Sequence, residues 1–225
     1  MARGLQLQAL LLKLKLELGR DVSSGQGTQE DTRFKHALKS AQEDLYENND
    51  WEFLSIHRDE TLVAGGRYYS FDADLSFESI DLAQVKVDGQ WINVCSGIGA
   101  NEYNLYDSDE DERTSQVYKW DSYESDQFEV WPIPDSNTQT LRFYGTKALS
   151  AFDSNTDTAD LDSLLIIYKA AISISKDQVE LMKFTRKYED RMHRLRAKQG
   201  KGCNFSMGNK PSVPMSNSQR FQYIK

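Results

Sequence analysis

The stretch "SIDLAQVKVDGQWINVC", residues 79–95, is the clearest β-hairpin in the sequence. Val85 and Val87 alternate with polar or charged neighbours, and Asp88-Gly89 follows them before a second apolar alternation begins. An Asp-Gly pair between two alternating segments is typical of a two-residue hairpin turn. The hairpin therefore predicts an antiparallel sheet in the middle of the chain.

Further strand-like segments extend this sheet from about residue 55 to 147. The stretch "ETLVAGGRYYSF", residues 60–71, predicts two strands around a Gly-Gly turn, and "FEVWPIPDSNTQTLRFYGTKAL", residues 128–149, predicts a second hairpin that closes the insert. Pro132 and Pro134 lack backbone donors and place that hairpin at a sheet edge. About six short strands without an intervening helix indicate an antiparallel sheet. We expect Cys95, in an apolar strand, to be a small core residue.

Helical patterns flank the strands. Leucines recur at helical spacing in residues 4–19, which are rich in Leu, Lys and Glu, so a helix ending near Gly19 is favoured over a strand. A second helix is predicted from Thr28 to residues 48–50. After the strands, a helix capped by Asp157 or Asp160 is interrupted near residue 175, which indicates either a bend or two helices. Its continuation carries one apolar face, formed by Leu181, Phe184, Tyr188, Met192 and Leu195.

These elements predict an α+β fold. An N-terminal helix pair and a long C-terminal helix or helix pair form a bundle, interrupted by an antiparallel β domain and followed by an extended C-terminal tail. The expected domains are N-terminal helices (1–54), the β insert (55–149), C-terminal helices (150–199) and an interaction tail (200–225).

Composition narrows the functional classes. The chain has 225 residues, a net charge of −8 and two cysteines. An acidic protein is a poor candidate for wrapping nucleic acid, although it suits a passage through which DNA slides. Two cysteines provide no disulfide scaffold and no metal-ligand spacing, which fits a reducing interior. The leucine-rich N-terminus is interrupted by charges and lacks a cleavage site, so we expect a soluble, unprocessed protein.

No catalytic motif is present in the sequence. Phosphate-binding and zinc-protease motifs are missing, and the three histidines are scattered, so we expect no cofactor and no enzyme. The acidic stretches beginning at Asp107 and Asp153 resemble calcium loops but lack the required Gly and final Glu. We interpret them as a solvated loop and a helix start, with an opportunistic cation at 107–112 left open. The sequence therefore offers no cluster of catalytic side chains that would support a hydrolase or a nuclease.

Two groups of residues suggest binding. The helix over 183–201 is basic, and contact with an acidic partner subunit, contact with DNA and simple solvation remain open for its side chains, namely Lys183, Arg186, Lys187, Arg191, Arg194 and Arg196. Tyr and Trp residues are abundant in the β region, and a small sheet cannot bury them all. We predict a subunit or tail interface at Trp131, Tyr144 and Tyr106.

The order of several short patterns resembles the head-to-tail adaptor (connector) proteins of tailed bacteriophages. The patterns are "LELG" at 16–19, "DLYENNDWEFL" at 44–54, "FEVWPIPDSNTQTLRFYG" at 128–145 and "LDSLLIIYKAAISISKDQ" at 161–178. The long acidic loop at 101–115 and Lys169 depart from the family pattern.

The resemblance implies a structural virion protein that is assembled in the host cytoplasm and located at the neck. Such proteins form a ring, commonly of twelve copies, below the portal; they extend the DNA channel without sequence-specific binding and dock the tail or nozzle. The tail at 200–225 would then reach the portal through Cys203, Phe205, Phe221, Tyr223 and Ile224. The alternatives are another neck component, such as a stopper or tail-completion protein, and a cellular module that stacks sugars on aromatic rings.

Overall fold

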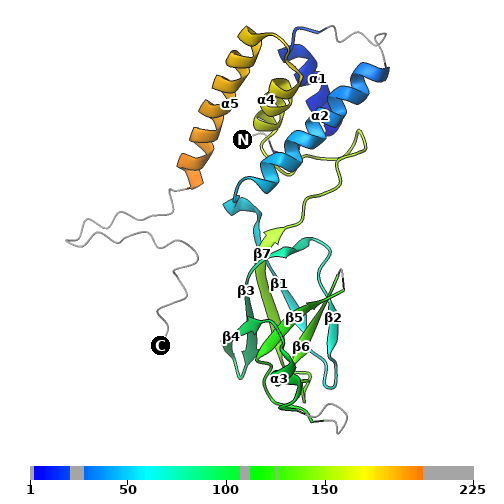
Figure 1. Cartoon of the computed structure of the whole chain (residues 1–225), viewed down its shortest axis with the longest axis vertical. Coiled ribbons are helices and arrows are strands. Elements are labelled where there is room, and N and C mark those ends of the chain that lie inside the picture. Colours follow the sequence, from blue (N-terminus) through cyan, green and yellow to red (C-terminus); the bar gives the residue numbers. More distant parts are fainter. Residues whose placement is uncertain (1–2, 21–27, 107–111, 125, 200–225) are drawn as a thin grey trace, which may run out of the picture. The chain divides into compact units, whose positions relative to one another are not determined.

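The computed structural model describes residues 3–20, 28–106, 112–124 and 126–199 (Figure 1). These residues form a mixed α+β fold with five α-helices and a curled seven-stranded sheet, as the sequence predicts in outline. The chain divides into two compact units. The helical unit comprises residues 1–42 and 153–225, and the β unit comprises residues 43–152.

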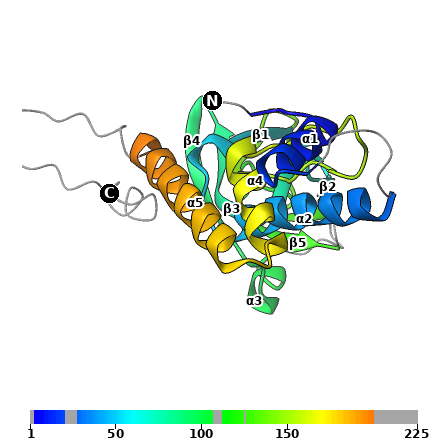
Figure 2. The same ribbon diagram turned by 90° about the horizontal axis from the view of Figure 1, so that it is seen from above.

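Four helices lie wholly or mainly in the helical unit: α1 (Leu7–Glu17), α2 (Thr28–Glu47), α4 (Ser163–Ile174) and α5 (Gln178–Gln199). The helix prediction for residues 4–19 is confirmed, and Gly19 follows α1 with a φ of 63° that favours glycine. The C-terminal helical pattern is two helices, separated at residues 175–177. Helix α4 packs against both α1 and α5 (Figure 2).

The core of the helical unit is mainly aliphatic, with two buried phenylalanines, Phe34 and Phe184. Helix α1 buries one face of leucines, and α4 is buried over most of its length because its composition is strongly apolar. Phe184, Met192 and Leu195 of α5 are buried, whereas Leu181, predicted on the same face, is 37% exposed. The predicted cap of α4 was also wrong. Asp162 accepts hydrogen bonds from the amides of Leu164 and Leu165.

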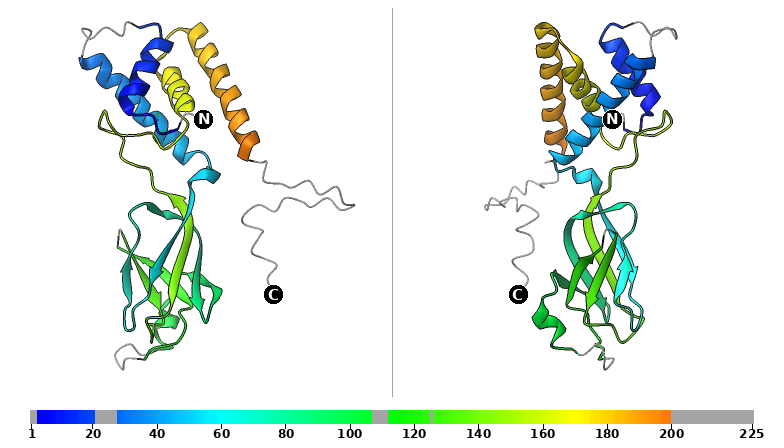
Figure 3. Two further views of the ribbon diagram at one scale, coloured as in Figure 1. Left: turned by 180° about the vertical axis from the view of Figure 1, so that it is seen from behind. Right: turned by 45° about the vertical axis from the view of Figure 1, so that its right-hand side comes forward.

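The strands of the β unit are β1 (Ser55–Thr61), β2 (Tyr68–Ser70), β3 (Leu75–Val87), β4 (Gln90–Ser96), β5 (Lys119–Tyr123), β6 (Gln127–Trp131) and β7 (Thr140–Lys147). Their order in the sheet is β1-β7-β3-β4-β5-β6-β2. Figure 3 shows the curled sheet from two further sides. A 3-10 turn, Glu52–Leu54, leads into β1, and a short helix, α3 (Ala100–Tyr103), follows β4.

Only one of the three predicted hairpins forms. The β3–β4 hairpin is confirmed, because Val85 pairs with Ile92 and Asp88 and Gly89 occupy the turn with positive φ. Strands β1 and β2 do not pair with each other; they form the two ends of the sheet order. Strands β6 and β7 do not pair either, so the second predicted hairpin was wrong.

Two further predictions about the sheet were wrong. Strand β6 lies between β5 and β2, not at an edge, and it ends before Pro132. The sheet is also mixed, since β4 and β5 are parallel, with Cys95 opposite Lys119. The prediction that Cys95 is a core residue was wrong as well: Cys95 is exposed because its neighbour Val94 points into the core, and successive strand side chains face opposite sides.

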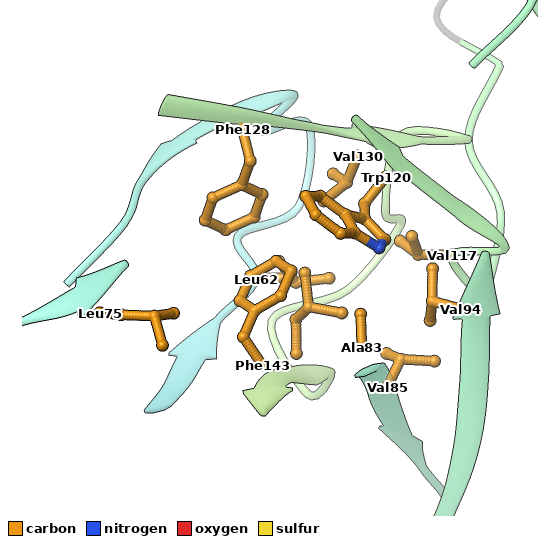
Figure 4. Close-up of a cluster of buried hydrophobic side chains, with 11 residues drawn as sticks. Leu62, Leu75, Ala83, Val85, Val94, Val117, Trp120, Phe128, Val130 and Phe143 are labelled. Carbon is orange, nitrogen blue, oxygen red and sulfur yellow. The ribbon is translucent and has the colours of Figure 1, made fainter. Parts of the chain in front are cut away.

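The core of the β unit combines aliphatic side chains with a cluster of aromatic rings (Figure 4). The ring centroid of Phe143 lies 4.8 Å from that of Phe128 and 4.9 Å from that of Trp120. Phe71 packs edge-on against Phe143 at 5.2 Å. Edge-to-face rings contribute about 0.5–1.5 kcal/mol per pair beyond burial. These contacts join β5, β6 and β7 across the inside of the curled sheet.

A register irregularity in β3 brings the backbone close to β7. Gly145 lies opposite Ile80, and the pairing shifts on both sides of that position. A Cβ atom added to Gly145 would lie 2.5 Å from the carbonyl oxygen of Ser79. Glycine is therefore required here by close approach of the two backbones.

Candidate interaction surfaces

The two units carry opposite charge. Residues 43–152 contain 23 acidic and 7 basic residues, a net charge of −16. Residues 1–42 and 153–225 contain 20 basic and 12 acidic residues, a net charge of +8. The chain total of −8 therefore describes neither unit. Each unit is suited to partners of a different sign.

An arginine at the start of β2 organises one surface of the β unit. The Arg67 guanidinium carbon lies 5.3 Å from the ring centroid of Tyr68, 5.1 Å from that of Tyr103 and 5.0 Å from that of Trp131. Its Nε donates to Glu129 Oε1 at 2.7 Å. Burial lowers the pKa of Arg67, but the hydrogen bond with Glu129, the charge of Glu129 and the hydrogen bond with Tyr103 together outweigh burial and raise the pKa. The cation is held by rings and by one carboxylate.

Trp131 belongs to this cluster and is buried. It faces outward from β6 with Glu129, but α3 covers it. Its Nε1 donates to the carbonyl of Glu102 at 2.9 Å, and Tyr103 packs edge-on at 5.0 Å. Only 3% of Trp131 is exposed. The indole is thus covered by its own chain, so an interface role for Trp131 stays a prediction that would require α3 to move.

Two tyrosines of the same sheet face remain open to solvent. Tyr68 is 45% exposed and Tyr123 is 39% exposed, and their ring centroids are 4.4 Å apart. We call them the tyrosine pair. Burial raises the pKa of Tyr68, so that phenol remains neutral at physiological pH. Neither tyrosine was among the predicted interface residues, although Tyr123 faces the same side of β5 as Asp121.

Tyr144 lies elsewhere on the sheet. Its ring is 5.7 Å from His57 and half-buried on β7. The neighbouring Arg142 lies 4.1 Å from the Trp91 ring centroid and forms two hydrogen bonds with Asp59, at 2.5 and 2.6 Å. That hydrogen bonding lowers the pKa of Asp59. Strands β3, β4 and β5 separate β7 from β6 in the sheet order, so the predicted trio does not form one site. Tyr106 is half-buried just after α3.

The predicted basic residues of α5 fall into two groups. Lys187 pairs with Glu17 of α1 at 2.7 Å, and Arg191 pairs with Asp162, the cap of α4, at 2.6 Å. Both side chains therefore tie α5 to the rest of the helical unit. Lys183, Arg186, Arg194 and Arg196 are exposed. A partner would meet these four cations first.

The helical unit also exposes apolar side chains. Leu12 and Leu16 of α1 are 45% and 61% exposed, and Val179 and Met182 of α5 are 68% and 60% exposed. Leu16 also lines a shallow groove together with Ile167 and Lys183. Exposed apolar side chains at neighbouring helix faces are typical of protein contacts.

Several predicted positions lie outside the described residues. These are Cys203, Phe205, Phe221, Tyr223 and Ile224 of the C-terminal segment, and residues 107–111 of the acidic stretch. Within the described ranges, no group of three metal-binding side chains gathers. Among the described helices, none has the length and apolar composition needed to cross a membrane.

Comparison with known proteins gives one family. A search of curated proteins finds no match. The family model for the SU10 adaptor protein matches residues 6–209, which include the whole β unit and most of the helical unit. The chain therefore belongs to the SU10 adaptor family, and its resemblance to phage head-to-tail adaptor proteins is confirmed.

Proposed function

We propose that this adaptor forms a ring below the portal, extends the DNA channel and docks the tail. The observation that carries the proposal is the family match over residues 6–209. Membership implies a structural, non-enzymatic role at the virion neck, in an oligomeric assembly with portal and tail proteins. The ring of twelve copies, the position below the portal and the channel are the finer parts of the proposal.

Ring contacts are proposed at the helical unit. Leu12, Leu16, Val179 and Met182 expose apolar surface that burial against a neighbouring copy would remove from water. Full burial of an exposed side chain of this kind contributes about 1.5–3 kcal/mol, and these side chains, which are already partly covered, contribute the corresponding part of it. Repeated contacts of this size support a ring of weakly associating copies that becomes stable when it closes or meets its template.

Electrostatic contacts are proposed at α5. Lys183, Arg186 and Arg194 are exposed, so an acidic surface of the portal or the phosphates of passing DNA fit them. Either contact weakens as salt rises, because exposed charges are screened. Lys187 and Arg191 are less suited, since both already pair with carboxylates of the same chain.

The C-terminal segment is proposed to hold the portal through Cys203, Phe205, Phe221, Tyr223 and Ile224. An extended segment that orders on binding adds contacts only when the partner is present. Removal of residues 203–225 should abolish ring attachment to portal-bearing heads. Unchanged attachment of the shortened chain would contradict this part of the proposal.

The experiment that tests the whole proposal is native mass measurement of the chain, alone and mixed with portal. We expect a discrete complex with portal whose mass contains many copies of the chain. A monomer alone is compatible, because such rings can form only on their template. A monomer that also ignores portal contradicts the proposed function. The Leu16→Asp and Met182→Asp variants should lower the copy number, whereas Tyr118→Ala, on the β unit, serves as the control.

A further inference from the structure

The outer face of β2, β6 and β5 carries the tyrosine pair in an acidic setting. Tyr68 and Asp121 both lie opposite Glu129 in the strand register, and Tyr123 follows two residues after Asp121. Glu124 and Asp126 stand in the turn between β5 and β6. Among the described residues, none of Asp121, Glu124 and Asp126 forms an ion pair, although the two carboxylate oxygens of Asp121 accept hydrogen bonds from the backbone amides of Ile98 and Ser122. Tyr68, Tyr123 and Asp121 thus share one face of the sheet, and Glu124 and Asp126 lie in the turn at the end of that face.

Exposed tyrosine rings beside carboxylates favour the binding of a cation. The face of a tyrosine ring attracts guanidinium and ammonium groups, and nearby carboxylates add Coulombic attraction. The same surface already binds one such group internally, because Arg67 lies within 5.3 Å of three ring centroids and pairs with Glu129. The described ion pair of Arg67 is with Glu129, not with Glu124 or Asp126 of the turn. Tyr68 already contacts Arg67 but remains 45% exposed, so a second cation would find its exposed part together with the ring of Tyr123 and the carboxylates of the turn.

We propose that the tyrosine pair is a docking site for an arginine- or lysine-bearing segment of another neck protein. The inference rests on the proposed ring and adds the chemistry of one of its partners. The cation would lie against Tyr68 and Tyr123, with Asp121, Glu124 and Asp126 around it. The net charge of −16 on the β unit adds a longer-range attraction for such a partner.

Symmetry argues for a different protein as the occupant. A closed ring is generated by rotation about one axis, which places every β unit at the same level. Each acidic β unit then lies beside other acidic β units, and their mutual repulsion needs cations from outside the ring. A second copy of this chain is therefore the less suitable occupant, and the test below distinguishes it.

A peptide experiment tests the chemistry on the full chain. The probe is an acetylated, amidated Gly-Arg-Gly-Arg-Gly peptide, compared with the same peptide carrying Gln for Arg, and binding is followed by amide shifts in NMR. We expect shifts at Tyr68 and Tyr123 with the Arg peptide only. Tyr123→Ala should weaken binding about fivefold, as loss of one exposed ring–cation contact implies. Tyr118→Ala is the matched control, since Tyr118 is a 47% exposed tyrosine outside the pair, and its variant should bind normally.

A cross-linking experiment tests the partner in assembled particles. A photo-reactive benzoyl-phenylalanine replaces Tyr123, and the cross-linked peptides are identified by mass spectrometry. A link to a Lys- or Arg-bearing segment of another virion protein supports the proposal. A link to a second copy of this chain, a link to a segment without a cation, or no link from a chain that is present in particles overturns it. Absence of the chain from particles would instead overturn the proposed function itself, and the inference with it.

Discussion

The helical unit and the β unit differ in the residues that form their cores. The helical unit packs leucine, isoleucine and alanine of α1 and α4 and ties α5 to them by ion pairs. The β unit packs Phe71, Trp120, Phe128 and Phe143 inside a curled sheet. Their charges also differ, +8 against −16.

The net charge of the whole chain hides the opposite charges of the two units. The net charge of −8 suggests a uniformly acidic protein that DNA would not contact. Divided by unit, the same residues give one basic and one acidic body, and each has its own candidate partner. Charge should therefore be counted by structural unit before partners are inferred.

The largest expected effect is a loss of stability that is confined to the β unit. Phe143→Ala removes the ring shared by three aromatic contacts in the β unit and should cost about 3–5 kcal/mol. Hydrogen exchange should show lost protection in β3 and β7, while α4 and α5 keep theirs. Phe77→Ala, at a side chain that is 43% exposed, is the control and should change stability by at most about 0.5 kcal/mol. Equal loss of protection in both units would show that they unfold as one body.

The second effect concerns the ion pairs of the helical unit. Asp162→Ala removes the cap of α4 and leaves Arg191 unpaired, so we expect a loss of about 3 kcal/mol in urea unfolding. Asp162→Asn keeps a capping oxygen and should lie between the wild type and the Ala variant. Lys187→Ala breaks a half-exposed pair and should cost less than about 1 kcal/mol. A cost for Lys187→Ala equal to that for Asp162→Ala would contradict this ranking.

The third effect tests the close backbone approach in the sheet. Gly145→Ala places a methyl group against the carbonyl of Ser79 and should destabilise the β unit by about 1–3 kcal/mol, measured as a lower thermal midpoint. Gly99→Ala is the control, because its nearest obstacle is the flexible carboxylate of Glu102. If both variants melted alike, the register of β3 opposite Gly145 would be wrong.

The smallest effect is a pH dependence. The pKa of Asp59 is lowered by its hydrogen bonds with Arg142, so the folded state holds the charged carboxylate more favourably than the unfolded chain does. This stabilisation is present above the unfolded pKa of about 3.9 and is lost as pH falls through the folded pKa. Asp59→Asn should therefore narrow the fall in the urea midpoint between about pH 7 and pH 3. An unchanged fall would show that the pair contributes nothing.

Local patterns in the sequence were sufficient for part of the fold. The leucine spacing predicted α1, and Asp88-Gly89 predicted the β3–β4 turn, because both depend on residues close in sequence. Strand pairing was harder. Ser55 pairs with Thr146 and Tyr68 with Glu129, and nothing local to either strand specifies a partner so distant.

The sequence predicted the type of interface but not the residues that form it. An interface rich in Tyr was expected, but Trp131 was chosen and Tyr123 was not. The alternation of side chains along β6 alone would place Trp131 on the surface, but the four-residue helix α3 covers it. Such a short helix leaves almost no periodic pattern in the sequence.

The strand order has a consequence for biosynthesis. Strand β1 pairs only after β7 has been made, and the sheet is then complete while α4 and α5 are still unsynthesised. The β unit can therefore fold on the ribosome before the helical unit that begins the chain. Leu7, Leu10 and Leu14 of α1 can be covered only after α4 has been made, so α1 is translated before the β unit but reaches its native contacts after it.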